Sequence, residues 1–145
     1  MDKARGESPL CQARRLLRHL GLRPRKGLGQ HFLIDSGVLG HIIQAAELSS
    51  ADTVIEVGPG LGILTRELAS RAGQVIAVEV DEPLATALGQ ELAGFPRVQV
   101  VPSDILALDI AQLLLTRTGL PPEALALQYK VVANLPYYIA SATLR

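Results

Sequence analysis

Residues with clear chemical potential follow four separate apolar runs of the sequence. A glycine-rich turn, EVGPGLG at residues 56–62, ends the first run, and Glu79, Asp104 and Asn134 follow the other three. If the runs are parallel strands of one sheet, their carboxyl ends share an edge, and ligands of such sheets bind beyond that edge. The four segments therefore predict one binding site built from residues far apart in the chain.

The glycine-rich turn suits a close approach between backbone and ligand. Gly58 and Gly60 can adopt the positive φ values that a tight turn requires. The third glycine, Gly62, comes one residue earlier than in the dinucleotide fingerprint G-x-G-x-x-G, and no lysine follows as it does in a GKS-type phosphate loop. This segment alone leaves both a ligand-binding turn and a purely structural turn open.

Two carboxylates follow the next two runs. Glu79 could accept hydrogen bonds from both hydroxyls of a ribose, and Asp104 could accept one from an adenine amino group. Each has a structural alternative, since Glu79 also suits a solvated strand end and Asp104 a helix cap. Taken with a glycine turn that makes no provision for a pyrophosphate, they favour S-adenosylmethionine over NAD as the cofactor.

The segment VVANLPYYIA supplies an amide, a proline and an aromatic ring after the fourth run. The side-chain oxygen of Asn134 and the carbonyl of Leu135, next to Pro136, could accept both hydrogens of an exocyclic amine. Tyr137 could stack on the ring that carries this amine. The lone pair of an adenine amine is delocalised, so acceptors on its hydrogens would favour methyl transfer to an unpaired or flipped base. A capped strand end with a core tyrosine is the structural alternative.

The order of the patterns predicts an α/β fold. Strands are expected at 53–57, 74–80, 97–101 and 129–134, helices at 10–20, 38–46, 61–72, 83–93 and 110–116, and loops at 21–29 and 120–123. Strands that are apolar on both faces and alternate with helices are typical of βαβ units. We therefore expect a parallel, doubly wound, Rossmann-like sheet buried on both faces.

Charge is distributed unevenly along the 145 residues, although the net charge is zero. Residues 1–30 carry eight Lys or Arg and two acidic residues, whereas residues 31–145 carry six and twelve. The basic start is an arm that meets nucleic acid, the solvated face of an amphipathic helix, or both. An organelle-targeting segment is a further interpretation, against which Asp2 and Glu7 argue.

Composition excludes several classes of protein. The single cysteine, Cys11, excludes an internal disulfide framework and leaves too little sulfur for a zinc site. No apolar run is long enough to span a bilayer, and no signal segment of the usual form is present. We therefore expect a cytoplasmic protein with no bound metal and no membrane partner.

Five segments in a fixed order carry a resemblance to a known family. They are KGLGQHFLID, VIEVGPGLGILTRELA, VIAVEVDE, SDIL and VVANLPYYIA. Together they resemble the ribosomal RNA adenine N6,N6-dimethyltransferases of the kasugamycin-resistance type, from about Lys26 to the end of the chain. The resemblance implies an S-adenosylmethionine-dependent enzyme that dimethylates two adjacent adenines in a hairpin near the 3′ end of small-subunit rRNA. It also implies a role in maturation of the small ribosomal subunit and a monomer when the protein is full length.

The resemblance assigns roles residue by residue. It implies cofactor contacts from His31, Leu33, Gly58, Gly60, Glu79, Asp104, Ile105 and Asn134. Gly58 would approach the methionine moiety, Glu79 the ribose and Asp104 the adenine. The catalytic motif around the target amine would be Asn134, Leu135, Pro136 and Tyr137. The family often has asparagine at the position of His31, where a histidine can still donate or accept a hydrogen bond.

The family's sheet continues beyond a fourth strand, and a small helical domain that helps bind rRNA follows. We therefore expect this chain to be a fragment that holds cofactor better than it turns over ribosomal substrate. Residues 1–30 would form a basic helix and arm, and residues 31–145 part of the catalytic domain. The alternatives are a macrolide-resistance enzyme that dimethylates an adenine of large-subunit rRNA, a non-catalytic RNA-binding or transcription-factor relative, and a small-molecule methyltransferase.

Overall fold

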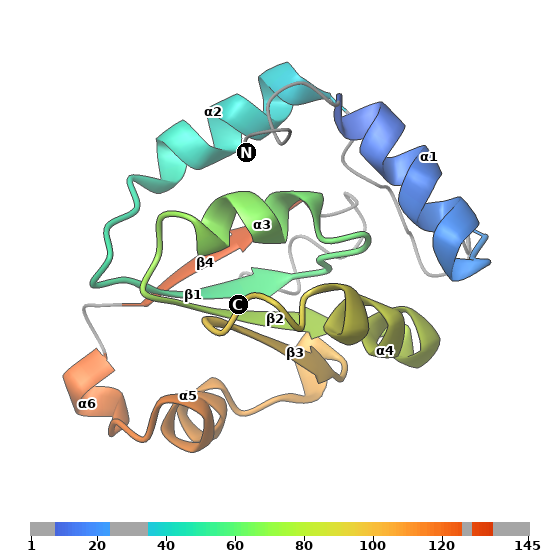
Figure 1. Ribbon diagram of the computed structural model, residues 1–145. Coiled ribbons are helices and arrows are strands. Elements are labelled where there is room, and N and C mark those ends of the chain that lie inside the picture. Colours follow the sequence, from blue (N-terminus) through green and yellow to red (C-terminus); the bar gives the residue numbers. More distant parts are fainter. Residues whose placement is uncertain (1–7, 24–34, 126–128, 135–145) are drawn as a thin grey trace.

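The computed structural model describes residues 8–23, 35–125 and 129–134 (Figure 1). The elements in chain order are α1 (Pro9–Leu20), α2 (Ser36–Ala46), β1 (Thr53–Val57), α3 (Ile63–Ala69), β2 (Gln74–Glu79), α4 (Glu82–Glu91), β3 (Val98–Pro102), the 3-10 helix η2 (Ile105–Ala107), α5 (Ile110–Thr118), α6 (Pro122–Leu125) and β4 (Tyr129–Ala133). No helix in these ranges is both long enough and apolar enough to cross a membrane.

The four strands form one parallel sheet in the order β3-β2-β1-β4. Val57, the last residue of β1, lies opposite Val78 on one side and Ala133 on the other. Glu79, the last residue of β2, lies opposite Pro102 of β3. The carboxyl ends of all four strands therefore meet at one edge, as the sequence predicts.

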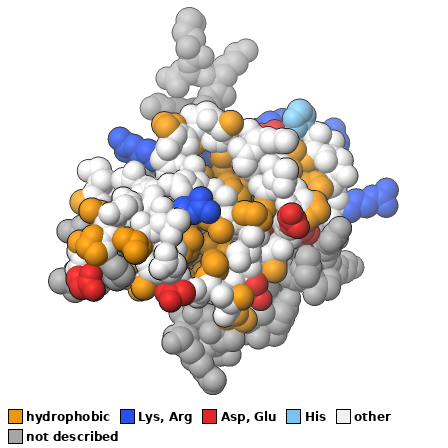
Figure 2. Space-filling view, turned by 90° about the horizontal axis from the view of Figure 1, so that it is seen from below, with side chains coloured by type: hydrophobic (Ala, Val, Ile, Leu, Met, Phe, Trp, Pro, Cys, Tyr) orange, Lys and Arg blue, Asp and Glu red, His pale blue; other side chains and the backbone are white. Residues whose placement is uncertain are grey.

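Helices cover both faces of the sheet, so the doubly wound arrangement is confirmed (Figure 1). On one face, Val54 and Val75 pack with Leu64 and Leu68 of α3, and α2 covers this cluster through its half-buried apolar side chains. On the other face, residues of β1, β2 and β3 pack against α5, in a cluster made of Ile55, Val57, Ile76, Val78, Val101, Leu113 and Leu114. The α5 face also exposes apolar side chains to the surface (Figure 2). Both faces of the central strands are thus buried, which explains their continuous apolar sequences.

Aspartates begin several of the helices. Asp35, Asp81 and Asp109 are the N-caps of α2, α4 and α5, and each accepts a hydrogen bond from the backbone N–H three residues later. These bonds satisfy amide groups that have no partner within the helix. These aspartates therefore set the residues at which α2, α4 and α5 begin.

One local expectation was wrong. The segment 120–123, expected to be a loop, contains the start of the short helix α6 at Pro122. Proline is well tolerated at the first position of a helix, where its missing N–H has no partner to lose. The structure also forms η2 directly after Asp104, which agrees with the cap considered for this residue. Of the loop expected at 21–29, only Gly21, Leu22 and Arg23 fall within the described residues.

At the amino ends of the strands, Lys130 fastens β4 to the end of α2. Its Nζ donates to the carbonyl oxygens of Ala46 at 3.0 Å and Glu47 at 2.6 Å, and to Asp52 Oδ2 at 3.1 Å. The same Asp52 oxygen accepts a hydrogen bond of 2.6 Å from the backbone N–H of Ser49. These contacts join segments 78–84 residues apart and lie at the edge opposite the polar strand ends.

Candidate cofactor and substrate site

The order of the strands reverses between β1 and β4. The chain runs from β1 to β2 and β3 on one side, and then returns to place β4 on the other side of β1. In open α/β sheets, ligands bind at the carboxyl ends of the strands where the order reverses in this way. Gly58 follows β1 and Asn134 follows β4 at this point, because their preceding residues Val57 and Ala133 are paired in register. The sheet thus brings these two predicted site residues together.

The glycine turn after β1 depends on positive φ angles. Gly58, Gly60 and Gly62 have φ values of 68°, 56° and 76°. The N–H of Gly58 donates to the carbonyl of Val78 at 2.9 Å, which fixes the start of the turn against β2. A Cβ on Gly58 would meet no described atom within 4 Å, whereas a Cβ on Gly62 would lie 2.5 Å from Leu88 Cδ1. Gly58 therefore leaves open space beside the backbone, and Gly62 allows close packing between α3 and α4.

Glu79 links the glycine turn to the turn that follows β2. Its side chain is almost completely buried, and its Oε2 accepts a hydrogen bond of 3.1 Å from the N–H of Gly60. Its Oε1 accepts one of 3.0 Å from the N–H of Asp81. Burial raises the pKa of the Glu79 carboxyl, and these two hydrogen bonds oppose the rise. Each oxygen keeps a second lone pair, so the carboxylate can still accept hydrogen bonds from a ligand.

Asp104 is exposed and caps η2. Its Oδ1 accepts a hydrogen bond of 2.9 Å from the N–H of Leu106, so the structural role considered for this residue is realised. The other carboxylate oxygen remains available to a ligand. Ser103 donates its N–H to the carbonyl of Glu79 at 3.0 Å, which places Asp104 at the strand end next to Glu79. Ile105 is half-buried and packs against the apolar cluster beneath the sheet.

Five predicted site residues lie outside the described residues. They are His31, Leu33, Leu135, Pro136 and Tyr137. Asn134 is the last described residue and is half-buried directly after β4. Gly58, Gly60, Glu79 and Asp104 therefore share an edge with Asn134, and the remainder of the predicted set stays a prediction. In the described part of the chain, no group of three or more His, Cys, Asp or Glu side chains is placed to hold a metal ion.

Glu56 is a residue that the sequence reasoning missed. It lies within β1, two residues before Gly58, and is only 1% exposed. Its Oε2 and the hydroxyl of Thr65 in α3 are buried, and neither has a hydrogen-bond partner among the described residues. Burial raises the pKa of Glu56 to about 8, opposed in part by the neighbouring Thr65 hydroxyl and assisted slightly by the Glu79 charge, so this carboxyl is mainly protonated at neutral pH. A single acid inside an otherwise apolar strand is the sequence signal that could have revealed it.

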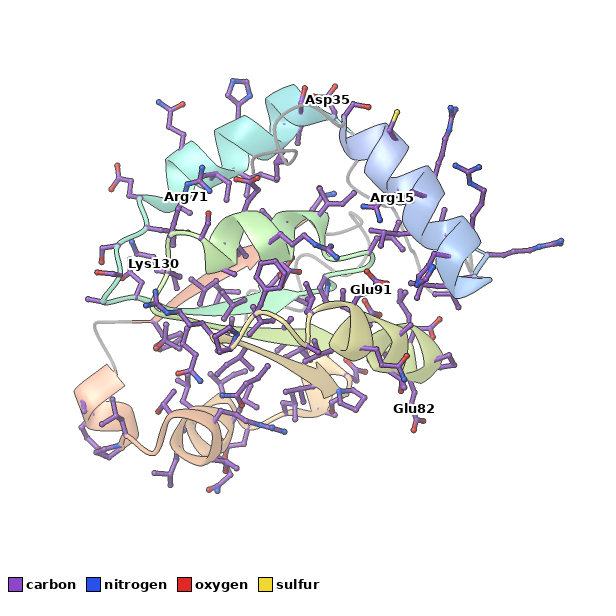
Figure 3. All side chains as sticks on the ribbon, in the orientation of Figure 1. Arg15, Asp35, Arg71, Glu82, Glu91 and Lys130 are labelled. Atoms are coloured by element: carbon purple, nitrogen blue, oxygen red, sulfur yellow. The ribbon has the colours of Figure 1, made fainter. Side chains whose placement is uncertain are left out.

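Arg66 fixes the exit of the glycine turn. Its Nη1 donates to the carbonyls of Leu61 and Gly62 at 3.2 and 3.1 Å, and its Nη2 lies 3.6 Å from Glu91 Oε2. Burial lowers the pKa of Arg66, and the charge of Glu91 opposes this effect. Figure 3 shows Glu91 in the region where α4 approaches α1. The turn is therefore held by Glu79 on one side and by Arg66 on the other.

Comparison with known proteins places this chain in a family. Residues 21–144 match the family described as ribosomal RNA adenine dimethylase. The ribosomal RNA small subunit methyltransferase A of Dehalococcoides mccartyi (strain ATCC BAA-2266 / KCTC 15142 / 195) is 53% identical over 138 residues, which are 95% of this chain and 44% of that protein. The protein of the same name from Moorella thermoacetica is 50% identical over 133 residues, with coverages of 89% and 44%. The chain thus spans somewhat less than half the length of the curated relatives it matches.

Two solved structures of rRNA or adenosine methyltransferases are similar to this chain in fold and sequence. The 23S rRNA methyltransferase ErmE is 38% identical with a TM-score of 0.65, over 79% of this chain and 41% of that one. A dimethyladenosine transferase from Plasmodium falciparum is 28% identical with a TM-score of 0.61, over 79% and 37%. The fold class and the family inferred from the five sequence segments are confirmed. The chain belongs to the ribosomal RNA adenine dimethylase family.

Proposed function

We propose that the chain provides the cofactor-binding and amine-binding part of an S-adenosylmethionine-dependent rRNA dimethyltransferase. Its substrate would be the N6 amines of two adjacent adenines in the 3′-terminal hairpin of small-subunit rRNA. The single observation that carries the proposal is the shared edge of Gly58, Glu79, Asp104 and Asn134 around the crossover between β1 and β4. The relatives with the highest identity given above are named small-subunit methyltransferases, which supports this choice of rRNA.

The residues at this edge fit an adenosine-bearing ligand. The open space beside Gly58 would admit the methionine moiety close to the backbone. Glu79 has lone pairs left for the ribose hydroxyls, and Asp104 has an oxygen left for the adenine amine. We propose further contacts from Gly60 and Ile105, and from the two residues His31 and Leu33 of the amino-terminal motif.

When bound, S-adenosylmethionine supplies a methyl group on a sulfonium, which is a good leaving group. The side-chain oxygen of Asn134 and the carbonyl of Leu135, before Pro136, would accept the two N6 hydrogens of the adenine. This favours a localised lone pair and stabilises the positive charge that develops on nitrogen. With the amine held in this way, the cofactor would supply the methyl group to the N6 lone pair and keep the electrons of the broken C–S bond as a neutral sulfide, and the extra N6 proton would pass to water. Tyr137 would hold the base by stacking.

The test is methyl transfer that depends on Asn134. Residues 1–145 would replace the matching part of the Dehalococcoides relative, so that the remaining half of the enzyme is supplied, and the chimera would be given undermethylated small subunits. We expect N6,N6-dimethyladenine in the rRNA, and loss of turnover in Asn134→Ala with a smaller loss of cofactor affinity. Dimethylation that survives Asn134→Ala would overturn the amine-binding role.

Large-subunit rRNA is the second candidate substrate, because the ErmE structure shares this fold at 38% identity. Naked large-subunit rRNA in the same assay distinguishes the two substrates. A non-catalytic relative would bind RNA and transfer no methyl group to either. A small-molecule methyltransferase would bind cofactor and modify neither RNA.

We also propose the division of the chain that the sequence suggested. Residues 1–30 would form a basic helix and arm, and residues 31–145 part of a catalytic domain that works with further residues in a longer, monomeric protein. The proposed partner is the small-subunit precursor particle, so the proposed location is the cytoplasm.

A further inference from the structure

The helix α1 is fixed to the site by its apolar face. Ala13 and Leu16 are 3% and 1% exposed and pack with Leu61, Ile63 and Leu84. Leu61 and Ile63 belong to the glycine turn and its helix, and Leu84 lies in the first turn of α4. Figure 1 shows α1 on the side of the sheet toward which the arrows of β1, β2 and β3 point. The helix therefore stands directly beside the proposed site.

The outer face of α1 is strongly basic. Arg14 and Arg18 are exposed and lie one helical turn apart, and the Nε of Arg18 donates to the carbonyl of Arg14 at 3.3 Å. Figure 3 shows nitrogen-tipped side chains that project outward from this helix. We call Arg14 and Arg18 the basic face of α1. Neither has an acidic partner among the described residues, and residues 8–23 contain four arginines and no acid.

The two positive charges of the basic face repel each other. Like charges four residues apart destabilise a helix by about 0.2–0.5 kcal/mol per pair. An acidic neighbour on the helix would remove the repulsion, and a bound polyanion would do the same. Arg18 lies in the last turn of α1, where the helix dipole favours a cation, whereas Arg14 lies in the middle of the helix and has no such compensation.

The remaining described surface has the opposite charge. Residues 35–134 carry twelve acidic and five basic side chains, and acids still predominate when the buried Glu56 and Glu79 are left out, so this part of the chain repels a polyanion. Guanidinium groups bind phosphate through two parallel hydrogen bonds, which suits arginine to an RNA backbone. The basic face of α1 is thus the part of the described chain where phosphates would be held, next to the edge where the reaction is proposed.

We propose that the basic face of α1 is a docking surface for the phosphate backbone of the rRNA substrate. It would hold the paired stem of a hairpin while an unpaired adenine enters the site at the strand ends. This inference rests on the proposed function, because it takes RNA as the substrate of that site.

The test compares two double variants of the 145-residue chain. Arg14→Gln with Arg18→Gln removes the basic face, and Arg97→Gln with Arg117→Gln removes the same charge near the opposite edge of the sheet. Binding to a synthetic RNA hairpin with two adjacent unpaired adenines would be measured by fluorescence anisotropy over a series of salt concentrations. Thermal unfolding followed by circular dichroism would show that both double variants fold, and the α1 variant should be no less stable than wild type.

For the α1 variant we expect roughly tenfold weaker RNA binding at low salt. The association constant should also depend less steeply on salt, with the slope of its logarithm against log[salt] smaller in magnitude by about 0.7–0.9 per lost phosphate contact. The control variant should change neither quantity by a comparable amount. Equal effects of both variants, or no effect of the α1 variant, would overturn the docking surface. Binding to vesicles of phosphatidylserine would be measured as a second experiment. If wild type binds the vesicles more tightly than RNA and the α1 variant loses this binding, the proposed RNA docking surface would also be overturned.

Cofactor binding separates this inference from the proposed function. Calorimetry with S-adenosylmethionine should give the same affinity for the α1 variant and wild type, since neither Arg14 nor Arg18 is among the proposed cofactor contacts. If wild type binds cofactor but no RNA, the docking surface is wrong and the cofactor site stands. If wild type binds RNA through α1 but no cofactor, the proposed function is wrong and an anionic docking surface remains.

Discussion

The carboxylate of Glu79 accepts a hydrogen bond of 3.1 Å from the backbone N–H of Gly60. This contact joins the end of β2 to the turn after β1, so the proposed ribose acceptor is also a brace for the proposed methionine-binding turn. A carboxylate that already has both oxygens engaged by N–H groups is held in one orientation before a ligand arrives. Preorganisation of this kind lowers the entropy cost of binding.

Glu79→Gln and Glu79→Ala should therefore differ. The glutamine keeps one acceptor oxygen in place, whereas alanine removes both and leaves the N–H groups of Gly60 and Asp81 without that partner. We expect calorimetry to show weaker S-adenosylmethionine binding for Glu79→Gln and little or none for Glu79→Ala. The exposed Glu82, in the first turn of α4, supplies the control Glu82→Ala, whose affinity should match wild type. Wild-type affinity in Glu79→Ala would remove the ribose assignment.

Glu56 should make the free energy of unfolding fall as the pH rises from about 4.5 to about 8. Its pKa is raised from 4.5 to about 8 in the folded state, so its contribution is fully present below 4.5 and is lost as the pH rises through about 8. The loss is on the order of a few kcal/mol, since one pKa unit corresponds to about 1.4 kcal/mol. Urea unfolding at several pH values across this range, without ligand, measures it. Glu56→Gln should flatten the decline, because the amide cannot ionise.

A matched control for Glu56 is the exposed Glu123 in α6. Glu123→Gln should keep the wild-type decline in the free energy of unfolding with pH. An equally steep decline in Glu56→Gln would show that another group is responsible.

The sequence predicted the strands well because burial on both faces gives them continuous apolar runs. β1 was predicted at its observed bounds, and the other strands within about one residue. The shared edge of Gly58, Glu79 and Asn134 followed from the parallel topology alone. The protonated state of Glu56 could not be predicted in this way, because it depends on how α3 covers β1. The role of Asp104 as a cap was open, since a cap and a ligand acceptor require the same residue type.

Lys130 was invisible to local patterns because its partners lie far away in the sequence. Lys130→Met should lower the free energy of unfolding by roughly 1–3 kcal/mol, since it leaves two carbonyl oxygens and a partly buried carboxylate without their donor. Urea unfolding at neutral pH measures this, and Arg97→Met, which removes an exposed cation, is the control.

Hydrogen bonding by the N–H of Ser49, and then by Lys130, lowers the pKa of Asp52 below 3.8. The stability from Asp52 is thus present above 3.8 and lost as the pH falls through its lowered pKa. If Lys130→Met lowers the free energy of unfolding no more than Arg97→Met does, the stabilising role of the Lys130 contacts would be contradicted.

The two outer glycines of the turn should respond differently to the same substitution. Gly58→Ala and Gly62→Ala both place a side chain at positive φ, which costs about 1–2 kcal/mol. Only at Gly62 does the new Cβ also meet Leu88 Cδ1, so Gly62→Ala should lower the free energy of unfolding more. Gly58→Ala should reduce S-adenosylmethionine affinity beyond what its smaller loss of stability explains, because the methyl group enters the space assigned to the methionine moiety. Calorimetry under conditions where both variants are folded separates the effects, and full affinity in Gly58→Ala would mean that this space is not used.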